Sequence, residues 1–141
     1  MTTTDSPTPT TTTTPINPVR WAEPFGFDQG QLRTGFTSIL TISGQGPVDA
    51  DGVLLHEGDV AAQLALTLAN LAAVLAEAGM TMADVAMLRT YTTDLGATLA
   101  VWDTVVEHLG SLGVTPPATL VEVTRLSRPG MVVEIDGLAI A

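Results

Sequence analysis

Glu134 is the residue of this chain best placed for acid–base chemistry. It interrupts an apolar run, Val-Val-Glu-Ile, at residues 132–135. A carboxylate at such a position either faces solvent on a strand or lies in a cleft, where it orients water or accepts a proton. Earlier in the chain, Gly44 follows a β-branched segment. A glycine after a strand can bring its backbone N–H close to a ligand, because it has no Cβ.

Other types of catalytic site find little support. His56 and His108 are isolated, and we interpret both as non-catalytic, because neither belongs to a cluster with metal-ligand spacing. We therefore expect no metal site. The chain has no cysteine, which excludes a thiol nucleophile, a disulfide framework and thiolate metal sites. All five cations are arginines, so Schiff-base catalysis and a P-loop lysine are excluded as well.

The composition of the chain limits the kinds of partner that it can bind. The chain has 141 residues, 45% of them hydrophobic, which suits one domain with a core. Its net charge of -10 disfavours nucleic acid and anionic membrane surfaces as partners. The N-terminus has neither a cationic start nor an apolar core, and polar residues interrupt the apolar run at 59–78. We therefore expect no signal peptide, no membrane span and a cytoplasmic location.

The strongest helix signal lies at residues 59–79. Apolar residues recur there at steps of four, four, three and four, which places them on one side of a helix. This stripe consists of Val60, Leu64, Leu68, Leu71 and Leu75. Gln63, Thr67, Asn70 and Glu77 lie off it. Asp59 is a good N-cap, and Gly79 can adopt the left-handed conformation that ends a helix. Burying the stripe contributes roughly 10 kcal/mol before ordering entropy is subtracted.

The remaining segments predict an α+β fold. Residues 1–15 are rich in Thr and Pro and predict a disordered tail, so the domain is expected at 16–141. Residues 16–30 predict an irregular segment that its aromatic rings pin to the surface or to an interface. Strands are expected at 31–34, 37–43, 85–93, 118–125 and 131–140, with a second helix at 97–109. This order predicts one sheet with two helices on one face, and an uncovered, partly apolar face that self-associates.

Several short motifs, in this order, resemble the RidA/YjgF family of reactive-intermediate deaminases. They are Ser43-Gly44-Gln45 with Pro47, Asn70-Leu71, Ala78-Gly79, Thr90-Tyr91-Thr92 with Asp94, Val121-Glu122-Val123 with Leu126, and Val133-Glu134-Ile135. Each motif is weak by itself, but the ordered set is specific, and it covers about residues 23–141. The resemblance implies a chorismate-mutase-like fold and a homotrimer with clefts between subunits. It also implies hydrolysis of enamines and imines to a 2-keto acid and ammonia, without cofactor or metal.

The match at the site is partial. Gly44 matches the family glycine, and Glu134 matches the glutamate that positions water. The arginine that grips the substrate carboxylate is replaced by Ala118, with Thr119 next to it. The family's pocket tyrosine corresponds to Phe27, and its second-helix asparagine corresponds to Trp102. The resemblance therefore implies a more apolar cleft, lined by Phe27, Trp102, Thr119 and Leu120. Such a cleft suits a larger or less charged ligand.

Three functions remain open on these grounds. The first is a RidA-like hydrolase acting on an enamine, an imine or a related small carbonyl metabolite. The second is an enzyme of specialised metabolism that uses the same cleft for another acid–base reaction. The third is a trimer that binds a small metabolite without chemistry. A ribonuclease role, suggested for family members, is disfavoured by the acidic balance and the lack of a basic groove.

Overall fold

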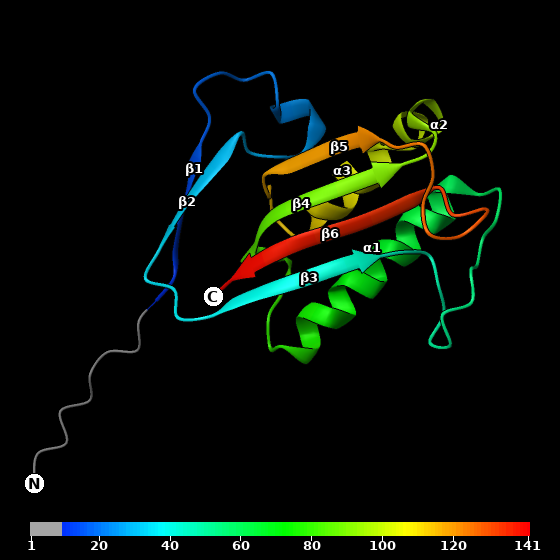
Figure 1. Ribbon diagram of the computed structural model, residues 1–141. Helices are drawn as coiled ribbons and strands as arrows, with labels where there is room; N and C mark the ends of the chain where they lie inside the picture. Colours follow the sequence, from blue (N-terminus) through cyan, green and yellow to red (C-terminus); the bar gives the residue numbers. More distant parts are fainter. Residues whose placement is uncertain (1–9) are drawn as a thin grey trace, which may run out of the picture.

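The computed structural model describes residues 10–141, which form an α+β structure (Figure 1). Its strands are β1 (Thr12–Ile16), β2 (Gly30–Thr34), β3 (Ile39–Gln45), β4 (Val85–Thr92), β5 (Ala118–Glu122) and β6 (Val133–Ile140). Its α-helices are α1 (Val60–Glu77), α2 (Leu95–Ala100) and α3 (Asp103–Ser111), with short 3-10 turns η1 (Glu23–Phe25) and η2 (Met82–Asp84). The α+β class expected from the sequence is confirmed.

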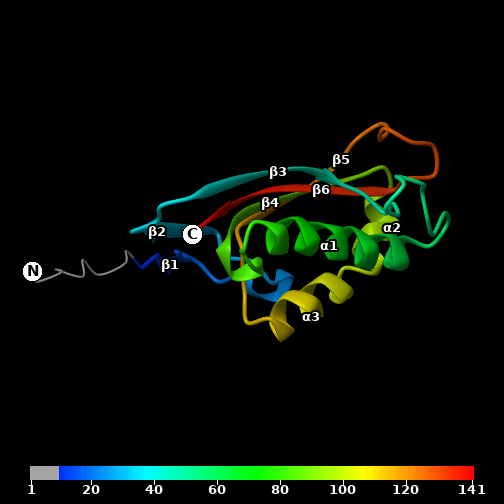
Figure 2. The same cartoon turned by 90° about the horizontal axis from the view of Figure 1, so that it is seen from below.

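The main sheet has four strands in the order β3-β6-β4-β5. β6 runs antiparallel to both β3 and β4, whereas β4 and β5 are parallel. Parallel neighbours need a crossover connection, and α2 and α3 provide it here. Figure 2 shows that all three α-helices lie on one side of this sheet, which leaves the other face uncovered.

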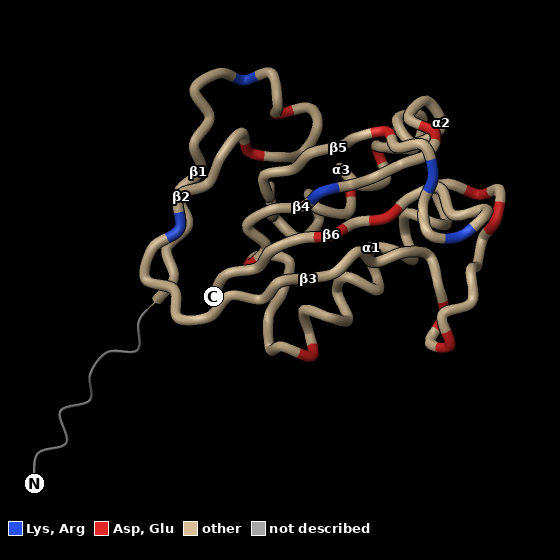
Figure 3. The backbone as a smooth tube through the Cα atoms, viewed as in Figure 1, with Lys and Arg blue, Asp and Glu red and all other residues tan. Residues whose placement is uncertain are grey.

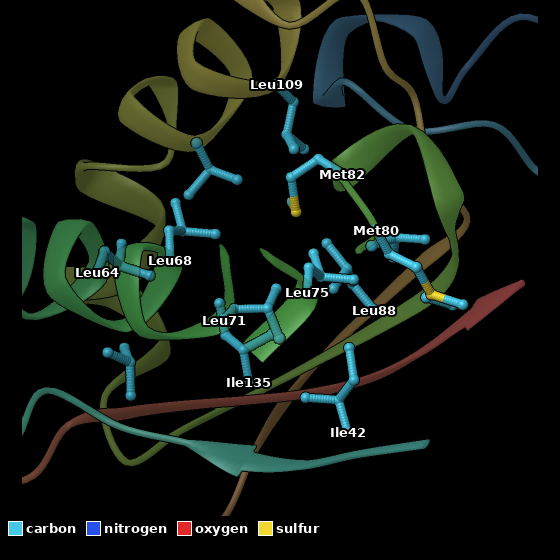
Figure 4. Close-up of a cluster of buried hydrophobic side chains, with 14 residues drawn as sticks. Ile42, Leu64, Leu68, Leu71, Leu75, Met80, Met82, Leu88, Leu109 and Ile135 are labelled. Atoms are coloured by element: carbon cyan, nitrogen blue, oxygen red, sulfur yellow. The ribbon is translucent and has the colours of Figure 1, made fainter. Parts of the chain in front are cut away.

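α1 is the central element of the core, as its sequence predicts. The Asp59 side chain accepts a hydrogen bond from the Ala62 N–H at 3.0 Å, which caps the first turn. The four leucines of the stripe are at most 3% exposed. They pack against Ile42, Leu88 and Ile135 of the sheet (Figure 4). By length and composition α1 could also cross a membrane, with a mean hydropathy of 1.6, but a core helix passes the same test.

The buried side of α1 is wider than the apolar stripe, which corrects one expectation. Gln63 and Thr67, predicted to lie off the stripe, are both fully buried. Gln63 is buried because loop backbone groups satisfy its amide: Nε2 donates to the Gly130 carbonyl at 2.9 Å, and Oε1 accepts from the Val132 N–H at 2.8 Å. A hydrophobic scale cannot register this kind of burial.

The N-terminal region differs from the prediction. The sequence predicts a disordered tail through residue 15, whereas the structure pairs β1 antiparallel with β2. Residues 1–9 of that predicted tail lie outside the described residues. β2 also does not join the main sheet, because it pairs with β1 instead. The Arg33 guanidinium ties this hairpin to the main sheet, donating to the carbonyls of Val85 at 2.9 Å and Ile140 at 3.3 Å.

The prediction of a single helix at 97–109 is wrong, because the structure has two separate helices, α2 and α3, in this region. The Asp94 side chain caps α2 two residues earlier than predicted, accepting from the Ala97 N–H at 2.9 Å. The helical structure is then interrupted by a turn at residues 101–102. The break lets α3 bury Val105 and Leu109 in the core, while Trp102 remains half-buried near the sheet edge. In one straight helix, Trp102 would lie on the same face as Val105 and Leu109 and would point in the same direction.

Candidate functional site

The uncovered face of the main sheet carries Gly44 directly against Glu134. A bulge in β3 falls between Ile42, which pairs with Gly137, and Gln45, which pairs with Ile135. Gly44 lies in this bulge. A Cβ added to Gly44 would overlap Oε1 of Glu134 and lie 2.7 Å from its Cδ. The close approach therefore requires glycine, because no larger residue fits without moving the carboxylate.

Beside this pair, Arg89, Tyr91 and Asp136 form a hydrogen-bonded network. Arg89 Nε donates to Asp136 Oδ1 at 2.7 Å, and the Tyr91 hydroxyl donates to Asp136 Oδ2 at 3.1 Å. Strand register sets this arrangement, since Arg89 is paired with Asp136 and Tyr91 with Glu134. Figure 3 shows the acidic positions on β6 and the basic position on β4 within the sheet.

The pKa values of this network shift as its contacts require. The hydrogen bond from Arg89 to Asp136, together with the charge of that carboxylate, raises the pKa of Arg89 above its usual value. Burial is the main cause that raises the pKa of Tyr91, and the hydrogen bond to Asp136 and the nearby negative charges add to it. The arginine therefore stays cationic and the tyrosine stays neutral at physiological pH.

An aromatic pocket lies at the open edge of β5, with a volume of about 220 Å³. Its lining is almost entirely apolar and consists of Trp21, Phe25, Phe27, Leu99, Trp102, Ala118, Thr119 and Leu120. The rings from the N-terminal segment contact one another: Trp21 and Phe27 are edge-on at 5.9 Å, and Phe25 stacks on Phe27 at 6.3 Å. Such a lining suits an apolar or aromatic group.

A buried carboxylate holds the N-terminal wall of this pocket in place. Asp28, next to Phe27, accepts hydrogen bonds from Asn17 at 2.7 Å, Thr115 at 2.8 Å and Gln31 at 3.0 Å. Burial alone would raise the pKa of Asp28, but these three hydrogen bonds outweigh it and the pKa lies below its usual value. Charge-assisted hydrogen bonds therefore fix the irregular segment to β2 and to the loop before β5.

The residues predicted from the sequence separate into two groups within one chain. Phe27, Trp102, Thr119 and Leu120 lie together in the aromatic pocket. Gly44 and Glu134 contact each other on the uncovered face, outside the residues that line this pocket. Thr119 lines the pocket and is the register partner of Arg89, whose hydrogen-bond partner Asp136 is two residues from Glu134 on β6. The two groups thus occupy one face and its adjoining edge.

Sequence reasoning missed Arg89, Tyr91 and Asp136 as a group. The signal was present, because Arg-Thr-Tyr and Glu-Ile-Asp each place polar residues two apart, on one side of a strand. That β4 and β6 are neighbours is not visible from local sequence. Within residues 10–141, no group of three or more His, Asp or Glu residues could hold a metal ion. His56 and His108 are exposed, and neither is among the residues that line the aromatic pocket.

Comparison with known proteins places the chain in a family. The model of the family described as endoribonuclease L-PSP matches residues 30–141. Protein DfrA of Myxococcus xanthus is 35% identical over 100 residues, which cover 71% of this chain and 74% of that protein. A RutC family protein of Pyrococcus abyssi is 26% identical over 117 residues, covering 83% of this chain and 88% of that protein.

Solved structures agree with this placement. YyfB of Yersinia pestis, a conserved Rid family protein of unknown function, superposes with a TM-score of 0.82 at 33% identity, covering 92% of this chain and 98% of that one. The YjgF gene product of E. coli superposes with a TM-score of 0.66 at 28% identity, covering 81% and 87% of the two chains. E. coli TdcF, solved with bound serine, gives 0.67 at 26% identity over 82% and 87%. This chain, with its single layer of helices on the β3-β6-β4-β5 sheet, belongs to the Rid/YjgF family.

Proposed function

We propose that this protein hydrolyses an enamine or imine that carries a bulky apolar group, releasing ammonia and a carbonyl compound. The observation that carries this proposal is the contact between Gly44 and Glu134. It places a carboxylate on an open face beside the backbone of Gly44, which carries no side chain. General-base catalysis needs a carboxylate in a defined position within reach of a water molecule.

In the proposed reaction, Glu134 accepts a proton from water as the water oxygen bonds to the imine carbon. An enamine first takes up a proton at its β-carbon to give the imine. Glu134 passes the proton that it took from water to the imine nitrogen, which gives a neutral carbinolamine. The hydroxyl proton of the carbinolamine then moves to its nitrogen through Glu134, the C–N bond breaks, and ammonia and the carbonyl compound are released. The backbone N–H of Gly44 is proposed to donate to a substrate carbonyl or developing anion.

The apolar lining of the aromatic pocket is the reason for proposing a substrate with a bulky apolar group. Ala118, at the place of the family arginine, contributes only a methyl group to its wall. Phe27 and Trp102 add aromatic surface where the resemblance implies polar groups. A small, charged substrate such as 2-aminoacrylate would leave this surface in contact with water, so we expect poor binding of that compound.

We also propose that the active unit is a homotrimer with the site between subunits. The uncovered face carries exposed apolar residues alongside its polar group: Ile39 is 58% exposed, Met87 42% and Val121 40%. An apolar face of this kind favours association. Assembly would bring residues of a second copy to a site that one chain leaves open. The location is proposed to be cytoplasmic, with a small metabolite as the ligand.

The test is ammonia release from imines generated in situ by an amino-acid oxidase acting on phenylalanine or alanine. We expect the wild type to accelerate release from the phenylalanine-derived imine above the rate in buffer. Glu134→Gln should lower this acceleration about 100-fold or more, because the general base is lost. Glu77→Gln, on the exposed end of α1, is the matched control and should behave as wild type. No acceleration with any imine would reject the deaminase proposal.

A metabolite-binding trimer without chemistry is the second candidate. Ala118 favours this candidate, because it stands where the resemblance implies an arginine that binds the substrate carboxylate, and alanine has no such guanidinium group. In that case aromatic ligands would raise the melting temperature, while neither the wild type nor Glu134→Gln would release ammonia. RNA cleavage, which the family description names, is disfavoured by the net charge of -10.

A further inference from the structure

Arg89 is the basic residue of the main sheet, since β3, β5 and β6 carry none and β4 carries no other. It lies on β4, an interior strand of the sheet, on the uncovered face. Its side chain is nevertheless 52% exposed, so the guanidinium is accessible within one chain. Its neighbours across the strands are Asp136 on β6 and Thr119 on β5.

The hydrogen bonds of Arg89 leave part of its guanidinium unused. Among residues 10–141, only Nε has a partner within the protein, which is Asp136 Oδ1. Asp136 Oδ2 accepts from Tyr91 instead of taking a second bond from the arginine. Asp136 therefore fixes the guanidinium through one edge, and both Nη groups are left to donate. Two parallel N–H groups are the geometry that binds a carboxylate in bidentate fashion.

The position of Arg89 relates it to both parts of the site. Glu134 is a diagonal neighbour across β4 and β6, and such neighbours have Cα atoms about 7–8 Å apart. On the other side, its direct partner Thr119 lines the aromatic pocket. Adjacent strands lie about 4.8 Å apart, so Arg89 on β4 is one strand away from Thr119 on β5 and one strand away from the β6 residues Glu134 and Asp136.

We propose that Arg89 binds the carboxylate of the substrate, so that the substrate is the enamine or imine of an amino acid with a large apolar side chain. The carboxylate lies on the Nη groups of Arg89, the side chain enters the aromatic pocket, and the reacting carbon faces Glu134. Asp136 is the positioning residue that orients the guanidinium. This assignment rests on the proposed function for its chemistry, but the binding event itself needs no turnover.

The test measures binding of a product-shaped probe by isothermal titration calorimetry. The probe is 2-oxo-4-phenylbutanoate, and its ethyl ester is the uncharged counterpart. Arg89→Met should weaken binding of the acid about 30-fold or more and change binding of the ester less than threefold. Arg125→Met is the matched control, since Arg125 is an exposed arginine outside the main sheet, and it should bind both probes as the wild type does.

Two further variants separate binding from folding. Arg89→Lys keeps the charge but loses the fork, so we expect an intermediate loss for the acid alone. Asp136→Asn should also weaken the acid selectively, while circular dichroism verifies that each variant is folded. Equal weakening of acid and ester, unchanged binding of the acid by Arg89→Met and Arg89→Lys, or no acid binding by the wild type would overturn the assignment. Because this test measures binding and not ammonia release, its result does not depend on whether the protein has deaminase activity.

Discussion

Thr119 is the register partner of Arg89 and also lines the aromatic pocket, so one residue joins the polar group of the open face to the apolar pocket at its edge. This contact exists because β5 lies parallel to β4 at the sheet edge. The polar network and the apolar pocket are therefore adjacent in one chain.

Gly44→Ala should disrupt the site while leaving the core intact. The added methyl group would overlap the Glu134 carboxylate, which must rotate away. We expect the proposed imine hydrolysis to fall at least about tenfold, with a stability loss below roughly 1.5 kcal/mol, because the collision involves the end of a flexible side chain. Steady-state kinetics and urea unfolding would measure the two effects.

Gly110→Ala is the control for this experiment. Gly110 lies in α3, and an added Cβ would meet nothing within 4 Å. Alanine there should stabilise the protein by about 0.5–1 kcal/mol through its higher helix propensity, without changing activity. Equal activities of Gly44→Ala and Gly110→Ala would show that the Gly44–Glu134 contact has no functional role.

Ala118→Arg should change substrate preference towards small carboxylates. The arginine would place a guanidinium in the wall of the aromatic pocket, at the position that resembles the family's anchor. We expect kcat/KM to rise for the alanine-derived imine and to fall for the phenylalanine-derived one, because the apolar volume shrinks. Competition between the two imines gives the ratio directly. An unchanged ratio would mean that this pocket does not contact the substrate.

Trp102→Ala should remove affinity for bulky substrates. The indole forms part of the aromatic pocket and packs against the core from a half-buried position. Truncation should weaken binding of an aromatic probe by about 1–3 kcal/mol and raise KM, with a smaller effect on the alanine-derived imine. Leu112→Ala provides a control, because Leu112 is 50% exposed and lies outside the aromatic pocket. A KM increase of equal size for both imines would contradict this role.

Acid should destabilise the N-terminal segment through Asp28. Its pKa is lower in the folded state than in the unfolded chain, so its stabilising contribution is present above the unfolded pKa of about 3.9. That contribution disappears as the pH falls through the lower, folded pKa. Asp28→Asn should cost about 1–3 kcal/mol at pH 7. Melting curves of wild type and variant should converge below about pH 4, and a difference that stays constant with pH would contradict this assignment.

Local sequence patterns were sufficient for much of this protein. The leucine stripe with Asp59 as N-cap predicted α1, and the β-branched runs predicted the strands of the main sheet within a few residues. These signals succeed because helix and strand periodicities are properties of neighbouring residues. The ordered motifs around Gly44 and Glu134 were also sufficient to identify the family, and the structure places these two residues in contact.

Only the tertiary structure decided which strands are neighbours, and with them the polar network. Nothing in the local sequence indicates that Arg89 and Asp136, which are 47 residues apart, interact. The β4–β6 register nevertheless brings Arg89 Nε to 2.7 Å from Asp136 Oδ1. The burial of Gln63, the break between α2 and α3, and the pairing of β1 with β2 were missed for the same reason. Each depends on partners far away in the chain, and strand order and register are set by packing over the whole domain, which local periodicity does not encode.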